Sequence, residues 1–275
     1  MAVNLLTKYG NKLDQAFKNG LYTSKAVNQD YNFTGAKTIE VMTVDTQELV
    51  DYNRASTGDR YGGNNELQDT KTSYTLSNDK SFKIAIDKGN YLDQGELKKA
   101  GEVLKLQMNE RVYPLIDKNR FGKVAATVKT NTGKFILAAG KEYDAVLDMN
   151  AFLDESETPI EGRYLFVTPD FYKGIKKQVV ESAQAPNTND TMIKKGFVGE
   201  IDGVPVVKVP ASYMPTDFKA LMWHKQAVLA PQKIADSRII TDSELVDGSI
   251  LVGRFYFDAF VLKAKEKAVT GVATK

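Results

Sequence analysis

The sequence contains no cysteine and only one histidine among its 275 residues. Without thiols the chain can form neither disulfides nor thiolate zinc sites, and it has no cysteine nucleophile. The single histidine, His224, cannot build a poly-histidine metal site, so we expect neither a metal nor another cofactor. The formal net charge is only +2, so the overall charge does not argue for a nucleic-acid-binding protein.

Long apolar runs are also missing from the sequence. No stretch approaches the ~20 apolar residues of a membrane-spanning helix, and residues 1–10 lack the long apolar region of a secretory signal. We therefore expect a protein kept in a cytosol-like compartment. Hydrophobic residues make up 42% of the chain and charged residues 26%, which is typical of a folded globular protein with a sizeable core in one or two domains.

The familiar catalytic signatures are absent: there is no dinucleotide-binding glycine motif, no phosphate-binding loop and no nucleophile elbow. The acidic cluster Asp154, Glu155 and Glu157 offers a carboxylate pair for acid–base chemistry, but its Ser, Thr and Pro neighbours favour a solvated loop. His224 beside Trp223 has no nucleophile at a recognisable spacing, which favours a structural histidine. We expect no enzyme, and a carboxylate-dependent hydrolase is the less favoured alternative.

Residues 1–35 are polar, and their aromatic side chains are too widely spaced to form a compact core. We interpret this segment as an N-terminal arm that lies on the surface of another subunit, with a partly disordered terminus as the alternative. The aromatic side chains expected to make the inter-subunit contact are Phe17, Tyr22, Tyr31 and Phe33.

Residues 36–70 predict a strand and a glycine-rich loop, and residues 71–92 predict a projecting β-hairpin. In this hairpin apolar and polar residues alternate on both sides of a turn at residues 77–80. A two-stranded ribbon is marginally stable in water by itself, so we expect this one to lie against a neighbouring subunit. The side chains expected at that contact are Tyr74, Leu76, Phe82, Ile84 and Ile86.

Residues 93–143 contain the clearest helix of the chain. Asp93 and Glu96 form a capping-box-like pair at its start, and apolar residues follow at helical spacing. The pattern predicts a long helix to about Arg111, where Pro114 kinks or ends it.

Residues 144–240 predict a mixed helical and β region, and residues 241–275 predict a closing aromatic-rich strand followed by a lysine-bearing tail. Asp202 and Gly203, between two runs of β-branched residues, predict a two-residue hairpin turn, because both tolerate positive φ. Pro205 lacks a backbone donor, which favours a sheet edge for its strand. The expected fold class is therefore α+β.

Four stretches of the sequence, taken in order, resemble the major capsid proteins of tailed bacteriophages with the HK97-like fold. They cover most of residues 36–265, and their order and spacing carry the likeness. The four stretches are ERVYPLIDKNRFGKVA, GRYLFVTPDFYKGIKK, GFVGEIDGVPVVKVP, and the segment from HKQAVLAPQKI to GSILVGRFYFDAFVL.

The resemblance implies a definite architecture. It consists of an N-terminal arm, an extended β-hairpin loop (the E-loop, residues 71–92), a P-domain with a long spine helix (residues 93–143), and a central A-domain (residues 144–240). Residues 241–275 then supply the closing P-domain strand and the C-terminal tail.

The resemblance also implies a function. The chain would be a structural coat protein that self-assembles into hexamers and pentamers of an icosahedral shell around packaged double-stranded DNA. The shell would assemble in the host bacterial cytoplasm, and the protein would be found in the capsid of the virion. No membrane partner is implied. The implied partners are a separate scaffolding protein, a portal, a possible decoration protein and DNA contacted nonspecifically. Another phage ring or tube protein is the alternative within the structural class.

Overall fold

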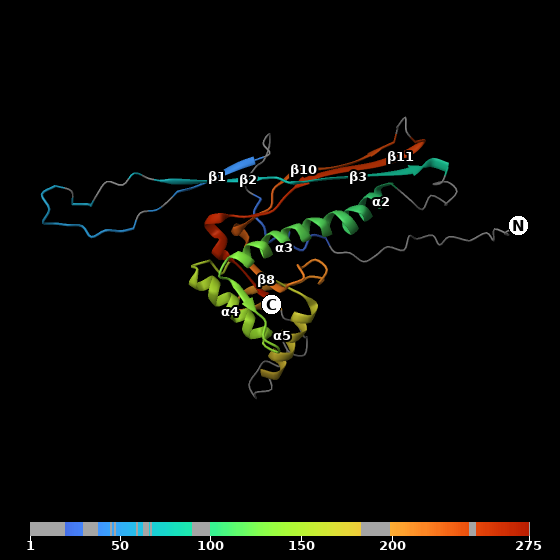
Figure 1. Cartoon of the computed structure of the whole chain (residues 1–275). Helices are drawn as coiled ribbons and strands as arrows, with labels where there is room; N and C mark the ends of the chain where they lie inside the picture. Colours follow the sequence, from blue (N-terminus) through green and yellow to red (C-terminus); the bar gives the residue numbers. More distant parts are fainter. Residues whose placement is uncertain are drawn as a thin grey trace. The chain divides into compact units, whose positions relative to one another are not determined.

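The computed structural model describes residues 20–29, 38–44, 46, 48–58, 60–62, 66, 68–89, 100–182, 199–241 and 246–274. The chain divides into two compact units. The small unit is Phe33–Leu76, and the large unit combines Met1–Asn32 with Ser77–Lys275. Figure 1 shows the helices and strands of both units.

The small unit is an antiparallel ribbon (Figure 1, blue). Strand β1 (Thr38–Val44) pairs with β2 (Asp69–Thr75) along its whole length. The Thr38 and Thr75 hydroxyls share a 2.8 Å hydrogen bond at one end of the ribbon. In the loop between the strands, the Asn53 backbone N–H donates to the Arg60 carbonyl at 3.0 Å.

The hairpin predicted at residues 71–92 is wrong in its pairing. Residues on its two sides belong to different strands with different partners: β2 pairs with β1, whereas β3 (Asn78–Asp87) pairs with β11 (Gly248–Phe257). An alternating pattern specifies the two faces of a strand but not its neighbour. Residues 76 and 77, between the two strands, belong to neither of them.

A three-stranded sheet with the order β10 (Gln232–Ile240), β11, β3 forms one end of the large unit. A long helix lies along this sheet (Figure 1) and buries Val112 and Ile116 against Phe255 and Phe257. The helix is made of α2 (Ala100–Gln107), the π-helical turn η1 (Met108–Val112) and α3 (Tyr113–Thr130).

The predicted end of the long helix near Arg111 is wrong, because the helix continues to Thr130. Pro114 lies in the first turn of α3, directly after the π turn. A proline ring clashes with the carbonyl of the preceding turn and has no N–H to donate. The wider π turn accommodates both defects, so the helix passes through the proline. Asp93 and Glu96, the predicted cap, lie outside the described residues.

The second sheet of the large unit has six strands. The helices α4 (Glu142–Glu155) and α5 (Pro169–Ser182) pack on one face, and α3 packs on the other. In spatial order the strands are β4 (Lys134–Ile136), β13 (Val269–Ala273), β8 (Phe218–His224), β5 (Arg163–Val167), β7 (Val204–Lys208) and β6 (Glu200–Ile201).

Short elements join this sheet to the three-stranded one. These elements are the 3-10 helix η2 (Lys225–Ala227), β9 (Val228–Leu229), β12 (Phe260–Val261) and the 3-10 helix η3 (Lys263–Ala268). Strands β9 and β12 pair antiparallel through two residue pairs.

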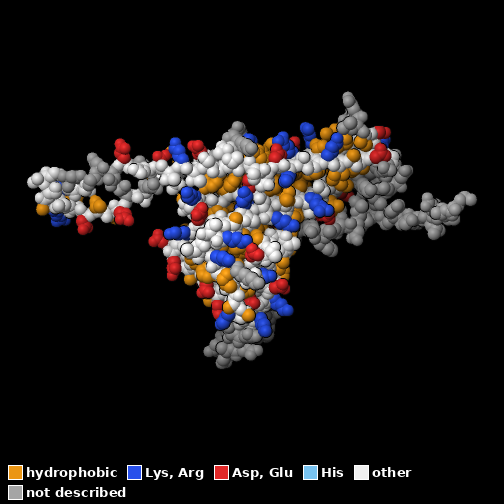
Figure 2. Space-filling model, in the orientation of Figure 1, with side chains coloured by type: hydrophobic (Ala, Val, Ile, Leu, Met, Phe, Trp, Pro, Cys, Tyr) orange, Lys and Arg blue, Asp and Glu red, His pale blue; other side chains and the backbone are white. Residues whose placement is uncertain are grey.

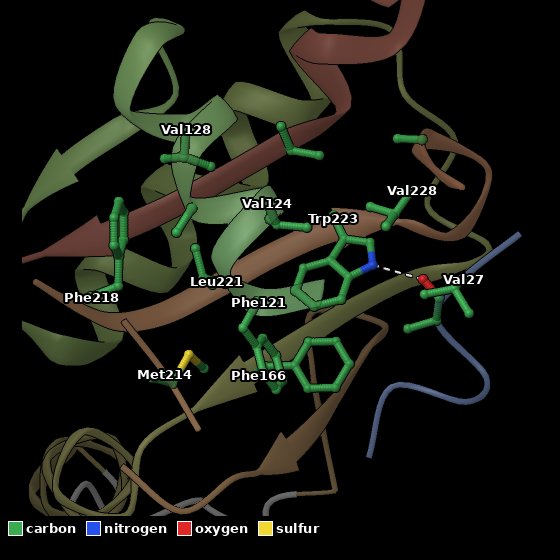
Figure 3. Close-up of a cluster of buried hydrophobic side chains, with 14 of the residues drawn as sticks. Val27, Phe121, Val124, Val128, Phe166, Met214, Phe218, Leu221, Trp223 and Val228 are labelled. Carbon is green, nitrogen blue, oxygen red and sulfur yellow. Dashed lines mark hydrogen bonds between the residues drawn. The ribbon is translucent and has the colours of Figure 1, made fainter. Parts of the chain in front are cut away.

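An aromatic cluster forms the centre of the core between α3 and the six-stranded sheet (Figure 3). Trp223 stacks on Phe166 with ring centroids 4.3 Å apart, and Phe121 of α3 meets both rings edge-on. The Trp223 indole N–H donates to the Ala26 carbonyl at 2.7 Å. One buried cluster therefore holds together β5, β8, α3 and the segment around Ala26.

Both chain ends differ from the sequence expectation. Residues 20–29, predicted to belong to an arm on another subunit, form part of this chain's own core, with Ala26 and Val27 buried. The predicted C-terminal tail instead contains β13, a buried strand between β4 and β8. The exposed lysines of the tail lie just before β13, in η3. They made the whole segment look polar in the sequence, so the short apolar strand after them was not predicted.

The hairpin predicted around Asp202 and Gly203 is confirmed. The two residues turn with φ of 51° and 75° between β6 and β7. The edge position predicted for the Pro205 strand is wrong, since β7 lies between β5 and β6. Although Pro205 has no N–H, the next residue, Val206, donates its N–H to the Gly199 carbonyl. A single proline therefore does not prevent β7 from having a neighbour on both sides.

Candidate functional site

The acidic cluster that sequence analysis singled out has a structural role. Arg163 of β5 is buried, and its guanidinium donates to the Asp154 carboxylate at 2.7 Å and to the Pro159 carbonyl at 3.0 Å. It also donates to the Asn150 side chain and the Thr158 carbonyl. Asp154 therefore faces an arginine, and this contact ties the end of α4 to β5. The Asp154 carboxylate has a structural partner rather than a place in a recognisable catalytic pair.

His224 also has structural partners. Its Nδ1 accepts from the Gln226 N–H at 3.3 Å, so Nε2 carries the proton and donates it to the Glu161 carbonyl at 2.8 Å. Gly162, with φ of +92°, leaves room for the ring, since a Cβ there would come within 3.0 Å of Nε2. Burial lowers the pKa of His224, and the nearby positive charges add to this effect, although the Glu161 hydrogen bond opposes it.

This environment predicts a pH dependence of folding. Because the folded-state pKa of His224 lies below the unfolded value of about 6.5, the stabilisation is complete above that pH and is lost as pH falls toward the folded value. Urea unfolding of the chain should show a lower midpoint at about pH 5.5 than at about pH 7.5. His224 is the only histidine, so His224→Gln should flatten this difference; an unchanged difference would contradict the assignment.

Neither a metal site nor a membrane segment is found in the part of the chain that the structure describes. No group of three or more acidic or histidine side chains there is arranged to hold a metal ion. Within the same residues, no helix is both long and apolar enough to cross a bilayer.

Asp258 is the centre of a polar network that sequence analysis missed. Its buried carboxylate accepts from the Ser77 hydroxyl at 2.6 Å and the Ser77 N–H at 3.0 Å, where β3 is about to begin. It also accepts from the Asn78 and Asn119 amides at 3.2 Å each, and the Lys123 ammonium lies 3.4 Å away. Asp258 thus fixes the start of β3 to α3 within the large unit.

Burial alone would raise the pKa of Asp258, but the hydrogen bonds from Ser77, Ala259 and Asn119 and the Lys123 charge together lower it. The carboxylate is therefore held in its charged form. A signal for this site was present in the sequence, since a single aspartate interrupts the apolar run FYFDAFVL. A buried charge in such a run requires several donors.

A second polar network attaches residues 20–29 to the long helix. The Asp117 carboxylate accepts from the Tyr22 N–H at 2.9 Å and the Thr23 hydroxyl at 2.6 Å. Arg120 donates to the same hydroxyl at 2.8 Å. Burial raises the pKa of Asp117 against these hydrogen bonds, and burial lowers the pKa of Arg120 to about 10. Both charges serve to position the backbone of residues 22 and 23.

The structure separates the residues predicted for the inter-subunit ribbon. Phe82, Ile84 and Ile86 lie on β3 in the large unit, all half-buried, and Phe82 stacks on Phe255 with ring centroids 6.2 Å apart. Tyr74 and Leu76 are in the small unit and are buried. Contact of these side chains with a neighbouring copy stays a prediction.

The residues predicted for the N-terminal contact are only partly described. Tyr22 packs edge-on against Tyr213 of the same chain, with ring centroids 5.6 Å apart, and its contact with another copy stays a prediction. Phe17, Tyr31 and Phe33 lie outside the described residues.

The small unit exposes apolar side chains at its ribbon tip, which we define as residues 48–58 and 60–62. Leu49 is fully exposed at 102% of its reference area, and Val50 is 66% exposed. Tyr52 and Tyr61 meet edge-on at 5.0 Å, so the tip has a defined shape. Figure 2 shows apolar side chains (orange) among charged ones on the ribbon. An apolar surface displayed in this way is typical of a contact with another molecule.

The large unit carries an apolar groove between the long helix and the three-stranded sheet. Phe82, Phe255 and Phe257 line it from the sheet, and Val112 and Leu115 line it from the helix. The basic side chains of Lys80 and Arg111 line it as well. The groove thus combines an apolar floor with positive charge.

Structural comparison finds solved structures with the same fold. A chain in the capsid structure of the cyanophage P-SCSP1u matches with a TM-score of 0.77 and 15% identity, covering 98% of this chain and 93% of that one. A Mycobacterium phage Che8 chain matches with a TM-score of 0.74 and 13% identity, covering 98% of both chains. The asymmetric unit of the bacteriophage PhiM1 mature capsid gives 0.70 and 12%, with 98% and 91% covered.

Neither a family model nor a curated protein sequence matches the chain. The structural matches nevertheless span nearly all of it, so the α+β, HK97-like fold expected from the sequence is confirmed.

Proposed function

We propose that this chain is the major capsid protein of a tailed bacteriophage, a structural coat subunit without enzymatic activity. One observation carries the proposal: this chain and the chains of the P-SCSP1u and PhiM1 capsid structures cover each other almost completely. Nearly the whole of this chain is thus matched by chains of capsid structures. The structural roles of Asp154 and His224 point the same way.

Assembly in this proposal depends on contacts between copies. The ribbon tip of one copy would insert Leu49 and Val50 into the apolar groove of a neighbour. The acidic Glu48 and Asp51 flank these two side chains in the sequence, and they would complement the basic side chains that line the groove. In a closed symmetric shell each such contact is repeated by every copy, so a modest pairwise affinity suffices.

The proposal includes the organisation of the shell and its partners. Copies would form hexamers and pentamers of an icosahedral particle that encloses double-stranded DNA. A net charge of +2 suits a wall that contacts DNA nonspecifically without binding it tightly. A scaffolding protein, a portal and a decoration protein are the proposed partners, and assembly in the bacterial cytoplasm would lead to the virion.

Sedimentation and negative-stain electron microscopy of the expressed chain test the proposal. We expect closed, roughly spherical particles, alone or after co-expression with a scaffolding protein. Tubes or flat rings would instead assign the chain to another class of phage structural protein. A chain that stays monomeric at high concentration under both conditions would refute the coat-protein role.

A further inference from the structure

Strand β10 (Gln232–Ile240) is an outer strand of the three-stranded sheet. In the described part of the chain it pairs with β11 alone, so its other edge has no partner strand. All five residues from 235 to 239 are exposed, which leaves both faces of the strand open there. An edge strand of this length presents a row of backbone donors and acceptors, and proteins either block such an edge or pair it.

The sequence of β10 is complementary to itself in the antiparallel direction. Residues 234–240 read IADSRII. If two copies pair about a two-fold axis through Ser237, Asp236 of each lies opposite the partner subunit's Arg238. In the same register Ile234 lies opposite the partner subunit's Ile240. Two ion pairs flanked by two apolar pairs would thus share one face of the joined strands, since side chains alternate between faces.

None of the registers shifted by one or two residues has both properties. A shift of the pairing by one residue places Asp236 opposite a serine or an isoleucine of the partner. A shift by two residues places Asp236 opposite a second Asp236, or Arg238 opposite a second Arg238, and like charges directly opposite each other are destabilising. The pattern therefore favours this alignment over the neighbouring ones, a preference that a merely solvated, charge-blocked edge would not require.

We infer that the free edge of β10 is an interface between two copies of this chain, paired antiparallel about a two-fold axis at Ser237. The inference rests on the proposed function and deepens it, because an icosahedral shell contains two-fold contacts. The same patch would serve on both copies, as a two-fold interface requires. Joining the two edges would extend the sheet of each copy from three strands to a shared six.

Cysteine crosslinking tests the pairing directly, since the chain has no cysteine of its own. Residues opposite each other in antiparallel strands have Cα atoms about 4.5–5.5 Å apart, which a disulfide can span. Ser237→Cys should therefore form a disulfide-linked dimer with oxidised glutathione. Ala235→Cys is the matched control, because two copies of residue 235 would lie about 14 Å apart along the strands.

We expect at least about fivefold more dimer from Ser237→Cys than from Ala235→Cys. Charge exchange gives a second readout. Asp236→Arg and Arg238→Asp should each weaken the contact by placing like charges opposite each other, and the double exchange should restore it. Equal crosslinking of the two cysteine variants, or no restoration by the double exchange, would overturn the inference.

The two proposals can fail separately. Closed particles without the Ser237→Cys dimer would leave the coat-protein role standing and overturn the β10 pairing, even if another segment protected this edge. If no particles form under any condition, the coat-protein role fails. Crosslinking of the free chain then decides the β10 pairing by the same criterion.

Discussion

Replacing Leu49 and Val50 together by aspartate should abolish closed particles while leaving the subunit folded. Both side chains project into solvent in the single chain, so little buried area is lost on substitution. In a contact between copies the two carboxylates would have to be buried against apolar side chains, at a cost of several kcal/mol per copy. Sedimentation and electron microscopy measure assembly, and circular dichroism measures the fold.

The control for the ribbon tip is an exposed apolar residue elsewhere. Ile160 is 53% exposed and belongs to the large unit, so Ile160→Asp makes a similar change of polarity at an exposed residue that is not part of the tip. We expect Ile160→Asp to assemble. Normal particle yield from the Leu49→Asp, Val50→Asp variant would contradict the role of the tip. An unfolded variant would contradict the expectation that these two side chains contribute little to the fold of the subunit.

The largest loss of subunit stability is expected from Trp223→Ala. The indole is completely buried, stacks on Phe166 at 4.3 Å and meets Phe121 edge-on. Truncating a buried aromatic of this size typically lowers the free energy of unfolding by about 3–5 kcal/mol, because a cavity remains. The substitution also leaves the Ala26 carbonyl without its indole donor. Urea unfolding of the variant and the parent chain measures the difference.

Trp223→Phe separates packing from hydrogen bonding at this position. It keeps an aromatic ring against Phe166 but removes the donor to Ala26, so we expect a smaller loss of about 1–2 kcal/mol. If Trp223→Ala and Trp223→Phe destabilise the chain equally, the aromatic stack contributes little and the account of this core is wrong.

Local signals in the sequence predicted local structure well. Asp202 and Gly203 have the positive φ that their turn requires, and the helical periodicity from Ala100 onward belongs to a real helix. Pairing over long distances could not be read in the same way. Asn78 pairs with Phe257 at one end of the β3–β11 ladder, and nothing in an alternating strand identifies so distant a neighbour.

The candidate contact surfaces were harder to predict than the elements. Leu49 and Val50 stand at the end of the stretch expected to form a strand, just before the glycine-rich loop. Nothing there marks them as exposed, because the exposure of a side chain depends on what the rest of the fold places beside it. Phe82 shows the converse. Its contact with another subunit stays a prediction, but β3 also places its ring against Phe255 inside the large unit, and only the pairing with a distant strand could have revealed this second contact.

Hydrogen exchange over the ribbon tip, compared between free subunits and particles, tests the central claim most directly. The tip exposes Leu49 completely and is proposed to bury it only on an adjacent copy. The account predicts rapid exchange of residues 48–62 in the free subunit and strong protection in the particle. Protection that is already complete in the free subunit, or exchange that stays equally rapid in the particle, would contradict it.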